Sequence, residues 1–303
     1  MNLIHELKKN RALFIMAAPA VALLLIFNYL PMFGVVLAFK DFNYEKGILF
    51  SNWSGFSNFE FLFRTDAAFE ITKLTIMYNM AFIIIGIVIP ILLAIILNEI
   101  RNRMLAKVYQ TVAIMPYFLS WVVVSFIFLA FLEPDKGYLN SVLKSFGIEP
   151  VFWYSEVKYW PGILIFANTW KNVGYSSIIY LAAITGISDE YYEAAILDGA
   201  GKLQQIYYIT LPFLKPMMII LTILAVGKIF YADFGLFYQV PMNYGQLYSA
   251  TNVIDVYVFN GLKTMGNIGM SAAANLYQSF VGFILVLGSN MIVRRIDKDY
   301  ALF

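Results

Sequence analysis

Six long apolar stretches constrain this chain more than any other feature of its sequence. A bilayer-spanning helix needs roughly 20 apolar residues, and each stretch supplies about that number. The stretches cover 12–39, 71–97, 108–132, 162–187, 212–231 and 271–293. The sequence therefore predicts an all-α, polytopic membrane protein with six transmembrane helices.

The composition excludes most other classes of protein. The chain of 303 residues is 61% hydrophobic and only 13% charged, whereas soluble domains average about 45–50% apolar and about 25% charged residues. It has no cysteine and one histidine, His5, which argues against a metal centre, thiol catalysis or a Ser-His-Asp triad. The net charge of +2 gives no basic field for nucleic acid.

The placement of lysine and arginine predicts the orientation, because these residues favour cytoplasmic segments. The first stretch follows a basic segment, as a signal peptide does, but it is longer than an h-region of about 7–15 residues, so a retained helix is expected. The basic residues crowded against helix ends on one side are Lys8, Lys9, Arg11, Arg101, Arg103, Lys107, Lys202, Lys215, Arg294, Arg295 and Lys298. Both termini are therefore expected in the cytoplasm.

Three longer connections, 40–70, 133–160 and 232–270, then face outward. They are rich in tryptophan, tyrosine and phenylalanine, which is typical of an interfacial aromatic belt. Their length also suits a docking surface for an extracellular partner.

The cytoplasmic connection 188–212 has the chemistry of helices rather than of a loop. Ser188 or Asp189 can cap a helix whose first turn is acidic, and Gly199 and Gly201 permit a sharp change of direction. The sequence predicts two short helices at an angle, about 188–211, beneath the membrane. A docking element for another protein and an amphipathic interfacial helix without a partner both fit these residues.

This connection resembles the EAA motif of ABC-importer permeases in spacing, cytoplasmic placement and position before the fifth helix. The matching residues are Glu193, Ala194, Ala195, Asp198, Gly199, Ala200, Ile209, Leu211 and Pro212. The whole chain is most similar to maltose-type carbohydrate permeases, and segments 28–31, 39–42 and 257–261 with the tail Arg294-Arg295 resemble the LplB-type branch, which handles oligosaccharides from polysaccharides.

The resemblance implies a type I ABC importer permease fold in a single domain, 1–303, of a bacterial cell membrane. It implies that the chain translocates oligosaccharides into the cytoplasm with a second permease subunit of different sequence, an ATPase dimer and an extracellular solute-binding protein. Glu193 would face a basic patch on the ATPase, Ala194 and Ala195 would enter its groove, Gly199 would form the bend, and Leu211 and Pro212 would lead into helix five.

The chain itself is not expected to be an enzyme or to bind a cofactor. The segment Gly199-Ala200-Gly201-Lys202 looks like part of a phosphate loop, but a phosphate loop requires Gly at 196 and Ser or Thr at 203. Ile196 and Leu203 occupy these positions. ATP and Mg²⁺ are therefore expected on a separate ATPase subunit.

Polar side chains within the apolar stretches are candidates for the substrate route, because such groups are costly in a bilayer. Aromatic and amide side chains suit sugars, and lysines suit acidic sugars. The candidates are Asn168, Trp170, Lys171, Asn172, Tyr175, Lys228, Tyr231, Tyr277 and Gln278. Each of them also fits polar contacts between helices, or snorkelling of the lysines.

Two other classes remain as alternatives. An intramembrane enzyme acting on lipid-linked sugar needs convergent acids or histidines at membrane depth, and only Asp233 approaches that description. A secondary transporter often contains repeats with broken helices in both halves. Pro19, Pro31 and Pro90 permit breaks, but no pattern repeats between the halves.

Overall fold

The computed structural model describes residues 9–64, 66–296 and 301, so His5, Lys8 and Lys298 lie outside the described residues. The structure is nearly all-helical, which confirms the predicted class. It contains two compact units, residues 1–64 with 261–277 and residues 65–260 with 278–303, hereafter unit 1 and unit 2. The single permease domain remains a prediction.

Unit 1 holds the first long helix and a small hairpin. Its elements are α2 (Arg11–Leu24), a π turn (Leu25–Tyr29), a 3-10 segment (Leu30–Phe39), β1 (Lys40–Asp41), α3 (Gly47–Phe50), β2 (Asn52–Trp53), a 3-10 turn (Ser57–Phe59) and α4 (Glu60–Arg64). β1 and β2 pair antiparallel. The buried Lys40 ammonium donates to the carbonyls of Ile48 and Leu49 at 2.9 and 2.6 Å, which fixes the hairpin.

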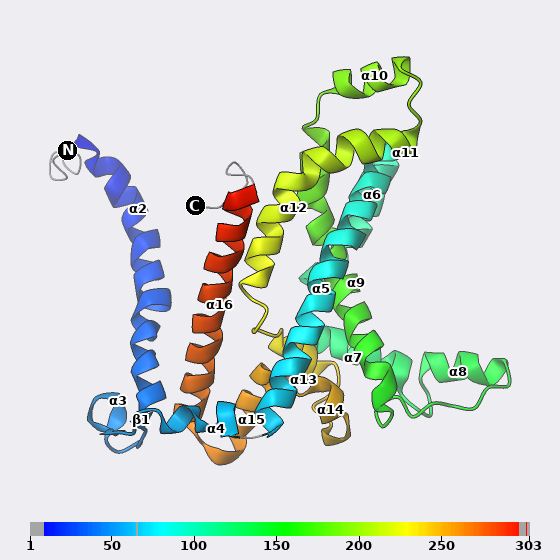
Figure 1. Cartoon of the computed structure of the whole chain (residues 1–303). Coiled ribbons are helices and arrows are strands. Elements are labelled where there is room, and N and C mark those ends of the chain that lie inside the picture. Colours follow the sequence, from blue (N-terminus) through cyan, green and yellow to red (C-terminus); the bar gives the residue numbers. More distant parts are fainter. Residues whose placement is uncertain (1–8, 65, 297–300, 302–303) are drawn as a thin grey trace. The chain divides into compact units, whose positions relative to one another are not determined.

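Unit 2 contains most of the remaining helices. They are α5 (Asp66–Glu99), α6 (Arg103–Ile114), α7 (Trp121–Leu132), α8 (Tyr138–Ser145), α9 (Trp160–Thr185), α10 (Asp189–Leu197), α11 (Lys202–Gln205), α12 (Leu211–Val226), α13 (Phe234–Gln239) and α14 (Tyr248–Thr251), while α15 (Ile254–Met265) and α16 (Ile268–Ile296) have residues in both units. Within unit 2, α10 and α11 lie at one end of α5, α9 and α12, and α8, α13 and α14 lie at the other end (Figure 1).

Among the described residues, four helices are long and apolar enough to cross a membrane. They are Arg11–Phe39, Ala68–Glu99, Lys202–Val226 and Ile268–Arg295. α9 has 26 residues, about 39 Å of helix, which exceeds a hydrocarbon core of about 30 Å. Its polar residues, among them Asn168, Lys171 and Asn172, keep it out of the apolar set. The count of six spans remains a prediction.

The third apolar stretch is not the straight span that its composition suggests. α6 continues into a 3-10 turn, Met115–Phe118, and then meets α7 at an angle of 102°. Pro116 occupies the start of the 3-10 turn, and the Ser120 hydroxyl caps α7 by accepting from the Val123 amide at 3.3 Å. Proline disfavours a continuous helix, and serine favours the start of a new one. The apolar stretch therefore contains the local sequence signals for this break.

Two apolar clusters hold unit 2 together. The larger lies at the end with α13 and α14, and includes Tyr78, Val124, Trp160, Leu164, Phe237 and Leu247. The smaller joins α5, α9 and α12 through Ile91, Ala94, Tyr180, Ile184 and Leu214. Both clusters contain residues of α5 and α9, and the smaller cluster adds α12 to this packing.

Candidate functional site

The EAA-like segment forms a helix and a bend at one end of unit 2. Ser188 caps α10 by accepting from the Glu190 amide at 3.4 Å, and Asp189 and Glu190 occupy the first turn. Carboxylates stabilise a helix N-terminus because its free amides carry partial positive charge. The helix therefore begins where its sequence favours a start.

Gly199 ends α10 and turns the chain. Its φ is +82°, a region that side-chain-bearing residues rarely adopt. The Ala200 amide donates to the Ala195 carbonyl at 2.8 Å and the Gly199 amide to the Ile196 carbonyl at 3.0 Å, which is a Schellman motif. The change of direction expected at Gly199 is present.

The second short helix is not separate from helix five, as the sequence suggested. α11, a π turn (Ile206–Thr210) and α12 form one helix, Lys202–Val226. Pro212 lies inside this helix rather than at its start. No loop therefore separates Lys202 from the apolar part of this helix.

Side-chain contacts fix α10 and α11 to the long helices. The Tyr192 hydroxyl lies 3.0 Å from the Thr210 hydroxyl, and the Tyr191 and Phe213 rings lie 5.1 Å apart. The Lys202 ammonium lies 2.9 Å from a Glu99 carboxylate oxygen at the end of α5. Leu211, one residue before Pro212, packs against the smaller apolar cluster.

The surface of this segment is open in the chain by itself. Glu193, Ala194, Asp198 and Gly199 are exposed, whereas Ala195 and Ala200 are half-buried. Leu197 is 89% exposed beside the bend. The eight residues expected to couple to an ATPase thus lie on one short helix, its bend and the first part of helix five.

Lys171, a candidate for the substrate route, is buried at the break between α6 and α7. Its ammonium donates to the carbonyls of Tyr117 and Leu119 at 2.7 and 2.6 Å, and to the Pro116 carbonyl at 3.4 Å. A bent helix leaves such carbonyls without partners. Lys171 therefore satisfies the backbone of the break.

Two further polar residues join this break to the segment after α12. The Trp121 indole at the start of α7 donates to the Asp233 carboxylate at 2.7 Å, and the same carboxylate caps α13 through the Leu236 amide at 3.3 Å. The Lys171 ammonium lies 5.3 Å from the centre of the Trp121 ring. The sequence singled out Asp233 as an acid approaching membrane depth, but it did not single out Trp121. The available signal for Trp121 was Ser120, whose N-cap marks the start of α7.

Three other candidates on α9 lie near this region. Tyr175 is 45% exposed and stacks on Tyr117 with ring centres 4.3 Å apart and planes at 8°. Asn172 donates back to the carbonyl and side chain of Asn168, both at 3.0 Å, along one helix face. The exposed faces of Tyr117 and Tyr175 offer a stacking surface. The two asparagines are hydrogen-bonded to each other, which leaves fewer of their polar groups for a sugar.

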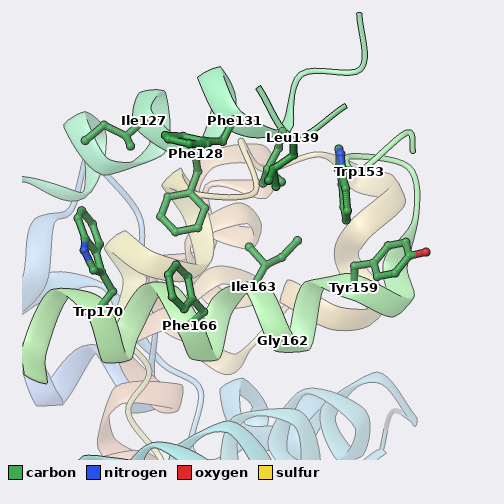
Figure 2. Close-up of a pocket in the computed structure, with 11 residues that line it drawn as sticks. Ile127, Phe128, Phe131, Leu139, Trp153, Tyr159, Gly162, Ile163, Phe166 and Trp170 are labelled. Carbon is green, nitrogen blue, oxygen red and sulfur yellow. The ribbon is translucent and has the colours of Figure 1, made fainter. Parts of the chain in front are cut away.

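Trp170 lines an apolar pocket of about 630 Å³ between α7 and α9. Figure 2 shows Ile127, Phe128 and Phe131 of α7 facing Ile163, Phe166 and Trp170 of α9. The lining is almost wholly apolar, whereas a sugar needs hydrogen-bonding partners. This pocket is therefore unsuited to hold an oligosaccharide.

Helix five breaks after Val226, and neighbouring side chains bind the freed backbone. The Asn79 amide donates to the carbonyls of Ile229 and Tyr231 at 2.9 and 3.0 Å. The buried Gln278 amide donates to the Phe230 carbonyl at 2.6 Å. Gln278 thus makes a polar contact between helices.

Three more groups surround the break. Asp255 accepts from the Ala232 amide at 2.8 Å, and burial raises the pKa of this carboxyl. The Tyr231 hydroxyl lies 2.5 Å from the Ser279 hydroxyl. Lys228 is exposed. The remaining candidate, Tyr277, belongs to unit 1 and meets the Phe63 ring edge-on at 6.2 Å.

The chain is similar to several known proteins over nearly all of its length. It is 32% identical to Protein LplB of Bacillus subtilis, covering 97% of this chain and 92% of that protein. It is 34% identical to the polygalacturonan/rhamnogalacturonan transport system permease protein YteP of the same organism, covering 98% and 92%. The resemblance to the LplB-type branch is confirmed.

A solved structure gives the same result for the fold. The crystal structure of a bacterial alginate ABC transporter, in complex with alginate pentasaccharide-bound periplasmic protein, matches with a TM-score of 0.87 at 30% identity, covering 98% of this chain and 99% of that chain. Residues 86–298 match the family of binding-protein-dependent transport system inner membrane components. This chain belongs to that family, and it is a permease subunit of an ABC importer rather than an enzyme.

Proposed function

We propose that this chain is one of two permease subunits that form the route of an ATP-driven oligosaccharide importer. The second subunit is expected to be a different chain. An extracellular binding protein would deliver the sugar to the end that carries α8, α13 and α14. The relatives named above support a sugar substrate, since one is a polygalacturonan/rhamnogalacturonan permease protein and a solved relative imports the acidic polysaccharide alginate.

The main support for this proposal is the exposed bend after α10, which is fixed to two long helices. Its ties to Glu99 and Thr210 would transmit movement of a bound ATPase into α5 and α12. In this proposal an ATPase dimer, with ATP and Mg²⁺, docks on the segment Glu193–Ala200 beneath the membrane. Six spans and both termini in the cytoplasm complete the arrangement, with membrane lipid around it.

ATP binding would close the ATPase dimer and favour an outward-facing route, and hydrolysis would return the inward-facing one. Each ligand would act by binding one conformation more tightly than the other. Tyr175, Tyr231 and the other polar residues of α9 and of the helix-five break are the expected contacts along the route, together with Tyr277. Lys171, Gln278 and Trp170 would act by shaping that route.

Glu193 provides the test. Glu193→Ala should lower binding-protein-stimulated ATP hydrolysis and uptake by about tenfold or more, because loss of one partner of an interfacial charge pair costs several kcal/mol. Glu190→Ala is the matched control, since Glu190 is an exposed acid in the first turn of the same helix. Equal activity of the two variants, in transporters reconstituted with the binding protein, would contradict the docking assignment.

A further inference from the structure

Two broken helices in unit 2 place irregular backbone within apolar stretches of the sequence. One break separates α6 from α7, and the other separates α12 from α13. Irregular backbone at membrane depth persists only where it is buried in protein or borders water, because lipid offers no hydrogen bonds. Each break therefore needs polar side chains from neighbouring helices.

In both breaks such side chains are present. The Lys171 ammonium donates hydrogen bonds to three carbonyls of the first break. The side-chain amides of Asn79 and Gln278 donate to three successive carbonyls of the second break. The Asp255 carboxylate accepts a hydrogen bond from the Ala232 amide. These hydrogen bonds to the backbone of the breaks are made without any contribution from Lys228.

Lys228 lies in the second break and differs from Lys171 in its exposure and in its hydrogen bonding. Lys171 is 8% exposed and bonded to carbonyls, whereas Lys228 is exposed and its ammonium has no hydrogen bond or ion pair with any residue that the structure describes. A bare ammonium facing hydrocarbon is disfavoured, and intramembrane cations face water, an anion or a protein partner. The side chain is therefore free to meet an anion.

We propose that Lys228 lines the translocation route and binds a carboxylate of an acidic oligosaccharide as it passes the helix-five break. The inference rests on the proposed function and adds a substrate class to it. Tyr231, three residues further on, donates its amide to the Lys228 carbonyl at 2.8 Å, so the two residues share one turn, and its hydroxyl is engaged by Ser279. The arrangement offers a cation and an aromatic ring, which together suit a uronic-acid residue.

The test uses the complete transporter, with its binding protein, in proteoliposomes. Uptake of a uronic-acid trisaccharide is compared with uptake of its methyl ester for wild type, Lys228→Gln, Lys228→Arg and Lys228→Glu. Lys228→Gln should lower uptake of the acid by about tenfold, since a charge-assisted hydrogen bond is lost. Lys228→Glu should lower it further, and Lys228→Arg should stay near wild type. Lys107→Gln, an exposed lysine of α6 that lies outside the helix-five break and the α10 segment, is the matched control.

The proposal and the function beneath it fail in different ways. A wild-type transporter that imports neither sugar contradicts the oligosaccharide function. One that imports the neutral ester but not the acid leaves that function standing and overturns the role of Lys228. The role of Lys228 is also overturned if Lys228→Gln takes up the acid at the wild-type rate, or if Lys228→Gln and Lys228→Arg lose uptake equally. Loss of subunit assembly in Lys228→Gln would place the lysine at a subunit interface, which also overturns it.

Discussion

At the scale of single residues, Lys171 and Lys228 show that one residue type serves two purposes within the apolar stretches. Lys171 donates to three carbonyls of a broken helix, and Lys228 donates to none of the described residues. The sequence predicted both as candidates for the substrate route, because both interrupt apolar runs. It could not separate them, since the difference depends on which helix lies opposite.

Lys171→Met provides a prediction at this scale. Methionine fills a similar volume but leaves the part-buried carbonyls of Tyr117 and Leu119 without the Lys171 donor, and each unsatisfied group costs about 1–3 kcal/mol. The free energy of unfolding should fall by about 2–5 kcal/mol, measured as a lower thermal midpoint of the detergent-solubilised chain. Lys228→Met, which removes no backbone contact, should be close to wild type. A similar loss in both variants would mean that the carbonyl contacts are not what stabilises this site.

At the scale of elements, the helices whose patterns are long and uninterrupted are those that the sequence predicted best. The stretches around α5 and α16 were predicted within a few residues of their observed ends. The break at Met115–Ser120 was not predicted, because hydropathy averaged over 20 residues does not register one proline. The join of α11 to α12 was missed for the opposite reason: proline at 212 suggested a start, although here it follows a π turn.

The packing of α6 on α9 depends on one glycine. A Cβ on Gly174 would overlap the backbone carbonyl of Ala113, and a backbone atom yields less readily than the end of a flexible side chain. Gly174→Ala should therefore force the two helices apart and cost about 1–3 kcal/mol or more. The expected result is a lower thermal midpoint and a lower yield of folded protein.

Gly162→Ala is the control on the same helix. A Cβ there meets nothing within 4 Å, and alanine has the higher helix propensity. This variant should match wild type or exceed it slightly. If both alanine variants behave alike, the close approach of α6 and α9 at Gly174 is contradicted.

At the scale of the whole molecule, the bends and clusters of unit 2 give its two ends different chemistry. One end presents Glu193 and Asp198 on an exposed bend, next to the ion pair of Lys202 with Glu99. The other end carries the larger apolar cluster and α8, α13 and α14. The crowding of basic residues predicted that the first end is cytoplasmic. The sequence could place the docking helix from these basic residues and from a motif that is local in the chain. The substrate contacts could not be placed in this way, because they require helices that are distant in sequence.

Orientation can be measured directly because the chain has no cysteine. Met104 at the start of α6 is 78% exposed, and Phe146 after α8 is 76% exposed, so the two positions are matched in access. A membrane-impermeant maleimide should label Phe146→Cys in intact cells and Met104→Cys only after the cells are permeabilised. Wild type, which lacks thiols, reports background. Labelling of Met104→Cys in intact cells would invert the orientation, and with it the assignment of α10 to the ATPase, because α10 and the start of α6 lie at the same end of unit 2 (Figure 1).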